Sequence, residues 1–406
     1  LSWINPIMKN FKSIFFIIFA SIIFSLYLFE TYLNMIDEKK DFKKIKKIYK
    51  SKTGKNFDER TPREVFEDVK DLGYVMSVPP TVHINKNSII LPLSGISKSE
   101  TIVCNENGYY SKYKSDRYGF NNLDSEWDEK NIEFLLIGDS YVQGGCVNRP
   151  DDIASVLRDL SNKPVLNLGY GGNGPLIEYA TLIEYFQPNI KNVLWFYYEG
   201  NDFYDLDNEI RDNTLIKYLN EKNFSQNLRI RQKQIDNINK DTISQSFFGN
   251  KLQNIKKNSK IKYKLIKFLR LDKTKNVIRN TFKENTIDYS YDKRNFKKII
   301  EKTNNYLKKN NSNFYFIYLP QLERYTKCPY EPCKDDRIYK KKLEDHKKMV
   351  KEIVKEFNIM LIDVDKEVFE VEDDSLKLFP FEIMDHYNAQ GYRKVATKIY
   401  DIISSK

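Results

Sequence analysis

Residues 132–140 read IEFLLIGDS, an apolar run that leads into a glycine and a serine. An apolar run of this length that ends in a turn predicts a strand buried on both faces, as strands of parallel sheets are. Ligands of such sheets bind beyond the carboxyl ends of the strands. The stretch therefore predicts an α/β fold in which Ser140 lies at the ligand-binding edge of the sheet.

Apolar runs and helical patterns alternate along the rest of the chain. Further strands are predicted at residues 164–168, 193–198, 314–319 and 360–364, and helices at 150–160, 176–186, 340–357 and 389–403. Strands that alternate with helices predict a mostly parallel sheet with helices on both of its faces. We therefore expect an α/β fold built as a three-layer, flavodoxin-like sandwich.

Three other short blocks carry polar residues beside predicted strands or the last helix. They read NLGYGGNG at 167–174, GND at 200–202 and HYN at 386–388. With the serine they supply a nucleophile, a glycine-rich turn, an asparagine and a histidine, the groups that serine-based acyl transfer requires. In this order the blocks resemble the SGNH (GDSL) hydrolase family, whose name lists the four residues. The resemblance covers roughly residues 110–202 and 313–405.

The resemblance implies a role for each block. Ser140 would be the nucleophile, and His386 would be the general base that takes its proton and later protonates the leaving alcohol. The backbone N–H groups of Ser140 and Gly172 and the side-chain amide of Asn201 would stabilise the oxyanion. These roles imply a ping-pong acyl transfer through a Ser140 acyl-enzyme.

The acidic member of the site departs from the family pattern. The family usually places an aspartate two or three residues before the histidine, where this chain has Met384 and Ile383. Asp385 and Glu382 are the two nearby candidates, while a backbone carbonyl could orient the imidazole of His386 instead. The sequence leaves open whether the site is a triad or a Ser–His dyad.

No cofactor, metal or nucleic-acid site is expected. The phosphate-binding pattern G-x-x-x-x-G-K-[ST] is absent from the glycine-rich block, which continues into Pro175. The other two histidines, His83 and His346, are predicted to be structural or surface residues. The net charge is +11 with 67 Lys and Arg. Lysine is abundant along the whole chain, however, without a basic stripe or a nucleic-acid motif, so a nucleic-acid partner is not expected.

Residues 13–29 carry no charge and are rich in Ile and Phe. A membrane-spanning helix needs about 17–25 apolar residues, and the run extends to residue 36 if the carboxylate of Glu30 reaches the interface. We expect residues 13–36 to be an uncleaved membrane anchor, with a cleaved signal peptide as the alternative. Lysines crowd both ends of the run, so charge alone does not orient it.

The chain has four cysteines. Cys328 and Cys333 flank a short, proline-containing loop, which indicates a disulfide in an oxidising compartment, with metal binding as the alternative. Cys104 and Cys146 would then pair and tie the N-terminal segment to the loop after the serine, although three connectivities are possible in principle. We expect a single-pass protein of the bacterial inner membrane whose catalytic domain is periplasmic.

The sequence predicts three segments, namely the anchor at 1–36, a spacer with an irregular extension at 37–128, and an SGNH-type catalytic domain at 129–406. Within that domain, residues 203–310 interrupt the strand–helix alternation and are too long for a simple connection. We expect a helical cap there, with a partly disordered excursion as the alternative. Residues 109–122 contain an Asp-x-x-Gly-Phe-x-Asn stretch, which either resembles one in membrane-linked family members or is an ordinary aromatic-rich loop.

The expected function is that of a serine-dependent ester hydrolase or O-acyltransferase acting on an acylated polysaccharide or another ester of the cell envelope. Water as the acceptor would make the protein an esterase, and a sugar hydroxyl would make it an acyltransferase. The alternative from another class is a catalytically degenerate module that binds glycan or scaffolds envelope assembly. The departure at the acidic position favours the module, whereas the intact serine, glycine, asparagine and histidine favour the enzyme.

Overall fold

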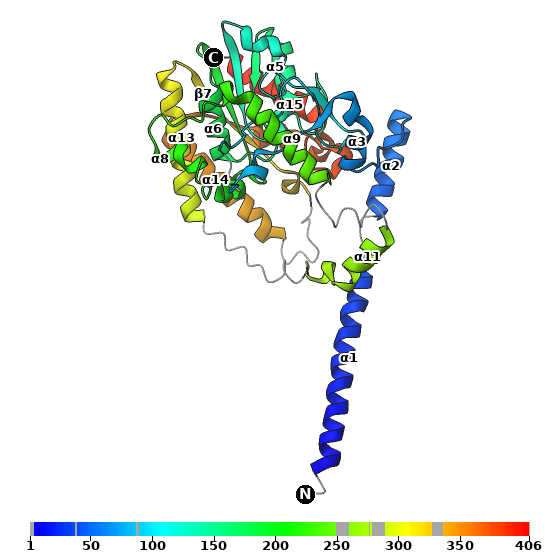
Figure 1. Ribbon diagram of the computed structural model, residues 1–406. Coiled ribbons are helices and arrows are strands. Elements are labelled where there is room, and N and C mark those ends of the chain that lie inside the picture. Colours follow the sequence, from blue (N-terminus) through cyan, green and yellow to red (C-terminus); the bar gives the residue numbers. More distant parts are fainter. Residues whose placement is uncertain are drawn as a thin grey trace. The chain divides into compact units, whose positions relative to one another are not determined.

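The computed structural model describes residues 4–36, 39–86, 89–248, 260–275, 277, 289–326 and 336–405 (Figure 1). The chain forms two compact units. The first comprises residues 1–55 and 245–287, and the second comprises residues 56–244 and 288–406. The second unit contains both β-sheets and the residues singled out for catalysis.

The larger sheet has five strands, all parallel, in the order β5-β4-β6-β7-β8. The strands are β4 (Ile132–Ile137), β5 (Val165–Asn167), β6 (Ile190–Tyr198), β7 (Asn313–Leu319) and β8 (Met360–Asp363). Each corresponds to a predicted strand, with small differences at the ends. The predicted α/β fold with a mostly parallel sheet is therefore confirmed.

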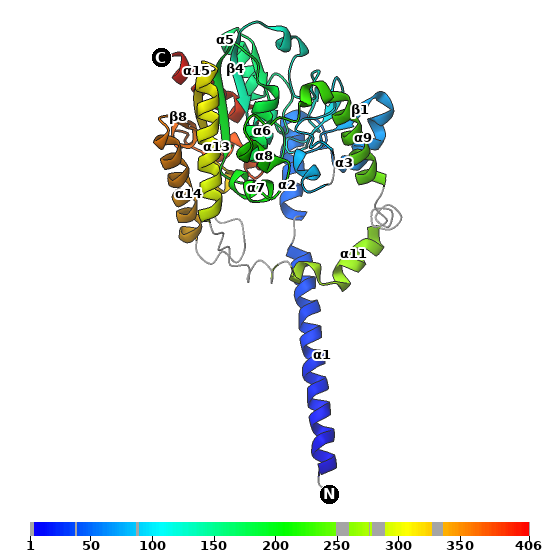
Figure 2. The ribbon, with the colours of Figure 1, turned by 60° about the vertical axis from the view of Figure 1, so that its left-hand side comes forward.

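Both faces of this sheet are buried, because successive side chains of a strand point to opposite faces. Along β6, Trp195 and Tyr197 pack into one core, and Leu194 and Phe196 pack into the other. Helices α6 (Pro175–Tyr185), α13 (Tyr289–Lys309) and α14 (Asp336–Glu356) supply the first core, and α5 (Ile153–Ser161) and α15 (Ala389–Ser404) the second. Figures 1 and 2 show the resulting layers.

Local capping determines where the helices beside the catalytic blocks begin. Helix α6 starts at Pro175, where the absent N–H would have had no intrahelical partner. Helix α15 starts after Asn388, whose side chain accepts a hydrogen bond from Gly391 N at 2.9 Å. Both helices thus begin directly after a predicted block, at 167–174 and at 386–388, and hold the ends of those blocks in place.

The N-terminal extension is more regular than its sequence suggests. It forms α3 (Pro62–Val69) and a small sheet in the order β1-β2-β3, made of β1 (Tyr74–Met76), β2 (Glu100–Ile102) and β3 (Lys112–Lys114). Strands of three residues are too short for an alternating pattern to show in the sequence. Strands β2 and β3 are antiparallel, and residues 103–111 form the turn between them.

The Asp-x-x-Gly-Phe-x-Asn stretch forms a loop around the buried carboxylate of Asp116. Asp116 accepts hydrogen bonds from the backbone N–H groups of Tyr118 (2.8 Å) and Phe120 (2.9 Å). It also accepts bonds from the side chains of Asn122 (2.8 Å) and Trp127 (2.6 Å). Burial raises the pKa of Asp116 to about 6. Four donors therefore converge on one acidic side chain and define the loop.

The same loop braces two catalytic blocks. Asn122 exchanges two hydrogen bonds with the backbone of Asn167, at 2.7 and 2.9 Å, at the end of β5. Asn121 donates to the carbonyl oxygen of Gln143 at 2.8 Å, in the turn that follows Ser140. The loop thus links the serine turn to the glycine-rich block through buried polar contacts.

The segment at 203–310 is divided between the two units. Helices α7 (Asp202–Glu209), α8 (Leu215–Asn220) and α9 (Gln232–Phe248) follow β6, and α13 leads into β7. Residues 203–244 and 288–310 belong to the second unit, where α13 covers the sheet, whereas residues 245–287 belong to the first. Long stretches of this segment therefore pack as helices against the first core.

The first unit contains α1 (Ile4–Ile36), α2 (Lys39–Thr53) and α11 (Lys260–Leu269). Residues Ile14–Leu33 are long and apolar enough to cross a membrane, a test that a signal sequence also passes. Glu30 within them is buried and accepts hydrogen bonds from the N–H (2.8 Å) and hydroxyl (2.7 Å) of Thr274. The carboxylate is thus satisfied inside the protein and does not depend on reaching an interface.

Removal of the Asp116 carboxylate should destabilise the second unit. In Asp116→Ala, four buried donors lose their acceptor, and we expect a loss of at least about 3 kcal/mol of unfolding free energy. Urea unfolding followed by tryptophan fluorescence would measure it. Asp128→Ala is the matched control, because Asp128 is largely exposed and should leave the unfolding midpoint near the wild-type value. Equal effects of the two substitutions would contradict the assignment.

Candidate active site

Ser140 stands at the carboxyl end of β4, as the first residue of the short helix α4 (Ser140–Gln143). Asp139 caps this helix by accepting a hydrogen bond from Tyr141 N at 2.9 Å. The helix ends at Gly144, whose φ of +88° is one that residues with a side chain rarely adopt. This tight turn holds the serine at the edge of the sheet.

His386 lies against Ser140, although 246 positions separate the two in the sequence. The distance from His386 Nε2 to Ser140 Oγ is 2.8 Å, which suits transfer of the serine proton. Gly145 allows this approach, because a Cβ at that position would lie 2.5 Å from His386 Cδ2. The structure therefore brings the predicted nucleophile and the predicted base together.

The acid that bonds His386 is Glu106, which the sequence analysis did not identify. Glu106 Oε1 lies 2.9 Å from His386 Nδ1, and Glu106 Oε2 accepts a hydrogen bond from the backbone N–H of His386 at 2.9 Å. A carboxylate on Nδ1 selects the tautomer whose Nε2 can accept a proton. Ser140, His386 and Glu106 form a Ser–His–Glu triad in geometry.

Glu106 and His386 favour each other's charged forms. Burial acts to raise the pKa of Glu106, but the hydrogen bonds and charge of His386 outweigh it and hold that pKa below its ordinary value. Burial acts to lower the pKa of His386, but the hydrogen bond and charge of Glu106 outweigh it and raise that pKa above 6.5. Glu106 is therefore ionised at neutral pH and can stabilise an imidazolium.

In the part of the chain that the structure describes, neither Asp385 nor Glu382 bonds the imidazole of His386. Asp385 Oδ1 accepts a hydrogen bond from the Tyr198 hydroxyl at 2.8 Å, and the Asp385 carbonyl accepts one from Tyr141. Glu382 is exposed. A side chain adjacent to a histidine cannot easily fold back to its Nδ1. Of the alternatives that the sequence left open, the structure places neither of these two side chains on the imidazole.

Sequence spacing does not indicate Glu106, because it lies 280 positions before His386. It occupies the turn at 103–111, close behind Cys104, and the structure forms the predicted disulfide between Cys104 and Cys146. That pairing is the signal in the sequence that places this turn near the serine loop. The other predicted pair, Cys328 with Cys333, falls outside the described residues.

Two of the groups predicted to stabilise the oxyanion are backbone N–H groups. Ser140 is the first residue of α4, so its N–H has no intrahelical acceptor. In the glycine-rich block, a Cβ on Gly171 would lie 3.8 Å from Ser140 Cβ, whereas one on Gly172 would meet Thr81 and Pro79 of the N-terminal extension. The structure thus places Gly171 beside the serine and Gly172, with φ +75°, at the turn behind it.

The third predicted donor, the amide of Asn201, bonds Asp205 in this structure. Asn201 Nδ2 donates to Asp205 Oδ2 at 2.8 Å. Burial raises the pKa of Asp205 to about 7, with a contribution from the charge of Asp139. Asp202 anchors the block by accepting a hydrogen bond from Tyr198 N at 2.8 Å. Because an amide NH₂ carries two hydrogens, this bond leaves the second N–H of Asn201 as the candidate donor to an oxyanion at Ser140.

A buried ion pair joins the carboxyl ends of β6 and β7. Glu199 accepts two hydrogen bonds from the guanidinium of Arg324, at 2.9 and 2.6 Å, and one from Gln321 N at 2.9 Å. Arg324 also contacts Asp365, with Nε 3.4 Å from Oδ2. Bidentate pairs of this kind have a defined geometry, so Glu199 fixes the loop after β7 relative to the asparagine block.

One cluster of potential metal ligands occurs among the described residues, and it coincides with the triad. The ligand atoms of Glu106, Cys146 and His386 lie within 4.8 Å of one another. The sulfur of Cys146 is already bonded to Cys104, whereas a cysteine binds a metal as its free thiolate. Two of its three members, Glu106 and His386, belong to the Ser–His–Glu arrangement, and with the disulfide formed Cys146 offers no thiolate to a metal.

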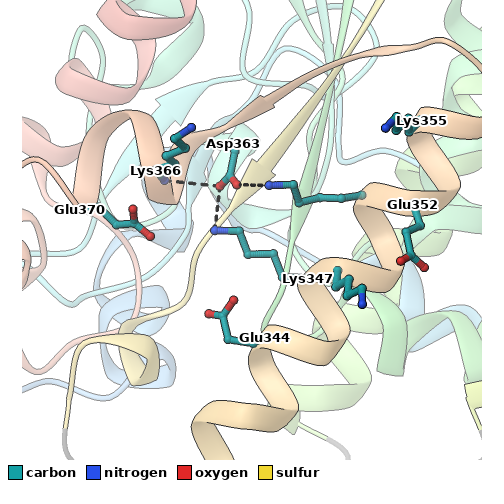
Figure 3. Close-up of a pocket in the computed structure, with 9 residues that line it drawn as sticks. Glu344, Lys347, Glu352, Lys355, Asp363, Lys366 and Glu370 are labelled. Carbon is teal, nitrogen blue, oxygen red and sulfur yellow. Dashed lines mark hydrogen bonds and ion pairs between the residues drawn. The ribbon is translucent and has the colours of Figure 1, made fainter.

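A surface pocket of about 370 Å³ lies between α14 and β8 (Figure 3). Lysine and acidic side chains alternate around it, and Asp363 pairs with Lys347 at 3.0 Å and with Lys351 at 2.8 Å. Its lining contains no member of the Ser–His–Glu arrangement. The charges of this pocket largely neutralise one another, so it offers no distinct binding chemistry.

Neither a protein-family model nor a curated protein matches the sequence. Similar solved structures include an acetyl xylan esterase, AlAXEase, with 15% identity and a TM-score of 0.37, covering 67% of this chain and 100% of that one. They also include a carbohydrate acetylesterase family member from Sinorhizobium meliloti, with 10% identity, a TM-score of 0.31, and coverage of 68% and 98%. The SGNH-hydrolase family esterase AlinE4 has 10% identity, a TM-score of 0.26, and coverage of 68% and 97%.

The architecture of the second unit follows from its sheet, its helices and the positions of the catalytic blocks. Its parallel sheet is covered by helices on both faces, and the serine and glycine-rich blocks follow adjacent strands. The histidine that precedes the last helix returns to the serine. The second unit is therefore a parallel α/β sandwich with the serine, glycine-rich and histidine blocks at one sheet edge, the arrangement that the resemblance to the SGNH hydrolases predicts.

Proposed function

We propose that this protein is a serine-dependent ester hydrolase. The observation that carries the proposal is the continuous set of contacts from Ser140 Oγ to His386 Nε2 (2.8 Å) and from His386 Nδ1 to Glu106 Oε1 (2.9 Å). A nucleophile bonded to a base that is itself oriented by a carboxylate is the arrangement of serine hydrolases. The set lies at the sheet edge where ligands of α/β folds bind.

The reaction follows from these contacts. Ser140 Oγ attacks the ester carbonyl carbon while its proton passes to His386 Nε2, and the carboxylate of Glu106 stabilises the imidazolium that forms. The tetrahedral intermediate expels the alcohol, which takes the proton from His386 and leaves an acyl group on Ser140. Water then loses a proton to His386, attacks the acyl carbon and releases the acid and the free serine.

The oxyanion of the intermediate would be held by the N–H of Ser140, by an N–H of the glycine-rich block, for which the family resemblance indicates Gly172, and by the second amide N–H of Asn201. One preorganised donor of this kind is worth about 2.7–4 kcal/mol of transition-state stabilisation. Protonation of Asp205, whose pKa lies at about 7, weakens its hold on the Asn201 amide.

The proposed substrate is an acylated carbohydrate or another ester of the cell envelope. The apolar stretch Ile14–Leu33 and the Cys104–Cys146 disulfide support a membrane-attached protein in an oxidising compartment, which we propose is the bacterial periplasm. Transfer of the acyl group to a sugar hydroxyl, in place of water, is the corresponding acyltransferase reaction. Incubation with acetylated glycans, followed by assays for free acetate and for acetylated acceptor, would separate the two reactions.

Activity of the serine should be visible with a fluorophosphonate probe on the full chain. We expect wild-type protein to be labelled and Ser140→Ala to be unlabelled, because the probe phosphonylates an activated hydroxyl. His386→Ala should be labelled at least about 100-fold more slowly. Ser161→Ala is the matched control, since its hydroxyl bonds only backbone groups, the carbonyl of Leu157 and the N–H of Lys163. Folded wild-type protein that stays unlabelled would instead support a non-catalytic module that binds glycan or scaffolds assembly.

Glu106 should control both the rate and its pH dependence. With p-nitrophenyl acetate as the substrate, kcat/KM of the wild type should fall as pH drops through the pKa of His386, which lies above 6.5, because the base must be neutral. Glu106→Gln removes the charge that raises this pKa, so the acidic limb should move to lower pH. The plateau should fall by about 10²- to 10⁴-fold.

The two acids beside His386 provide the controls for this experiment. Asp385→Asn and Glu382→Gln should each lower kcat/KM less than tenfold, because neither side chain bonds the imidazole. A Glu106→Gln enzyme with wild-type rates and an Asp385→Asn enzyme without activity would show that the acid is assigned to the wrong residue.

A further inference from the structure

The turn that carries Glu106 is attached to the loop after the serine at several points. Cys104 is bonded to Cys146 through the disulfide. Asn107 Nδ2 donates to the carbonyl oxygen of Cys146 at 2.9 Å, and directly after the turn, at the start of β3, Lys112 N donates to Asn148 Oδ1 at 2.9 Å. One bond in this set is covalent, and it lies beside the acid.

We propose that the Cys104–Cys146 disulfide positions Glu106 against His386, so that the site reaches full activity only when these two cysteines are oxidised. The proposal rests on the proposed function and adds a positioning role for a residue pair that does not touch the substrate. It makes the redox state of the compartment a condition for catalysis.

Cys146 can hold Glu106 against His386 because the loop that contains Cys146 already contacts the imidazole of His386. Gly145 packs under the imidazole of His386, where a Cβ would lie 2.5 Å from Cδ2. Cys146 Sγ itself lies 3.9 Å from His386 Nδ1. One short loop therefore supports the base from one side and, through the disulfide, holds the acid on the other.

The acid needs such support because it comes from a different sheet. Strand β2 lies between β1 and β3 in the small sheet, and among the described residues no strand pairing connects the turn at 103–111 to the five-stranded sheet. A hydrogen bond such as that from Asn107 competes with water and is individually weak. Catalytic groups must stay within roughly 0.5 Å of the productive geometry. A covalent link next to Glu106 meets this requirement.

A double-mutant cycle in kcat/KM tests the proposal on the full chain in detergent. The variants are Cys104→Ser with Cys146→Ser, Glu106→Gln, and all three together. If the disulfide acts through Glu106, its removal should lower kcat/KM at least about tenfold in the wild type and less than about twofold in Glu106→Gln. Equal losses in both backgrounds would overturn the proposal. Asn107→Ala, which keeps the disulfide, should cost less than about threefold.

A second measurement detects the contact between Glu106 and His386 without requiring enzyme activity. The chain has three histidines, and their environments separate them. Burial lowers the pKa of His346 to about 4 and also lowers that of His83, whereas the pKa of His386 is raised. NMR titration of histidine Cε1 resonances can therefore follow His386 by its high pKa. Asp139 and Asp385, which also act on His386, are unchanged in every variant.

Loss of the disulfide should lower the pKa of His386 in the same direction as Glu106→Gln does. Dithiothreitol should produce the same shift in wild-type protein, because it passes two electrons to the disulfide and becomes a cyclic disulfide while two thiols form. Removal of the reductant in air should reverse it. EDTA is included, since a freed Cys146 thiolate, His386 and Glu106 could together bind zinc.

The two measurements distinguish the failure of this proposal from the failure of the proposed function. A His386 pKa that falls on disulfide loss, in a protein without esterase activity, would retain the positioning role and reject the hydrolase. In the opposite case, the pKa of His386 stays unchanged, the enzyme stays active and only the midpoint of thermal unfolding falls. The disulfide would then be a structural cross-link, and the positioning role would be rejected.

Discussion

Parallel hydrogen bonding within the five-stranded sheet is the constraint on which the site depends. Because the strands run in one direction, their carboxyl ends meet at one edge, and the segments that follow them must gather there. Ser140 follows β4, the glycine-rich block follows β5 and the asparagine block follows β6. These three strands are neighbours in the order β5-β4-β6. The nucleophile therefore lies between the other two blocks.

Polar contacts at this edge hold the catalytic blocks in defined positions. Asp116 organises a loop through four donors, and Asn122 within that loop bonds the backbone at the end of β5. On the other side, Glu199 and Arg324 hold the loops after β6 and β7 together. Buried polar groups are costly unless they are fully paired. Their pairing here fixes the catalytic blocks relative to one another.

The acid of the site illustrates how one role can be filled from a different part of a chain. The positions before His386 that usually carry the aspartate hold Ile383 and Met384. Glu106 bonds Nδ1 of the imidazole instead, and it lies on a turn of the small N-terminal sheet. What the site requires is a carboxylate on Nδ1, and any segment that can be held there supplies it. The N-terminal extension is thus part of the site and not only a spacer.

The features that depend on local pattern could be predicted from the amino-acid sequence. Apolar runs located the five parallel strands, and the short blocks after them located Ser140 and His386, because such signals are carried by neighbouring residues. Only the tertiary structure decided the small sheet, the division of 203–310 and the identity of the acid. Asp385 is next to His386 in the chain yet turns to Tyr198, while Glu106 is 280 positions away and in contact. Side-chain direction and long-range packing decide that contact, and neither is encoded in sequence spacing.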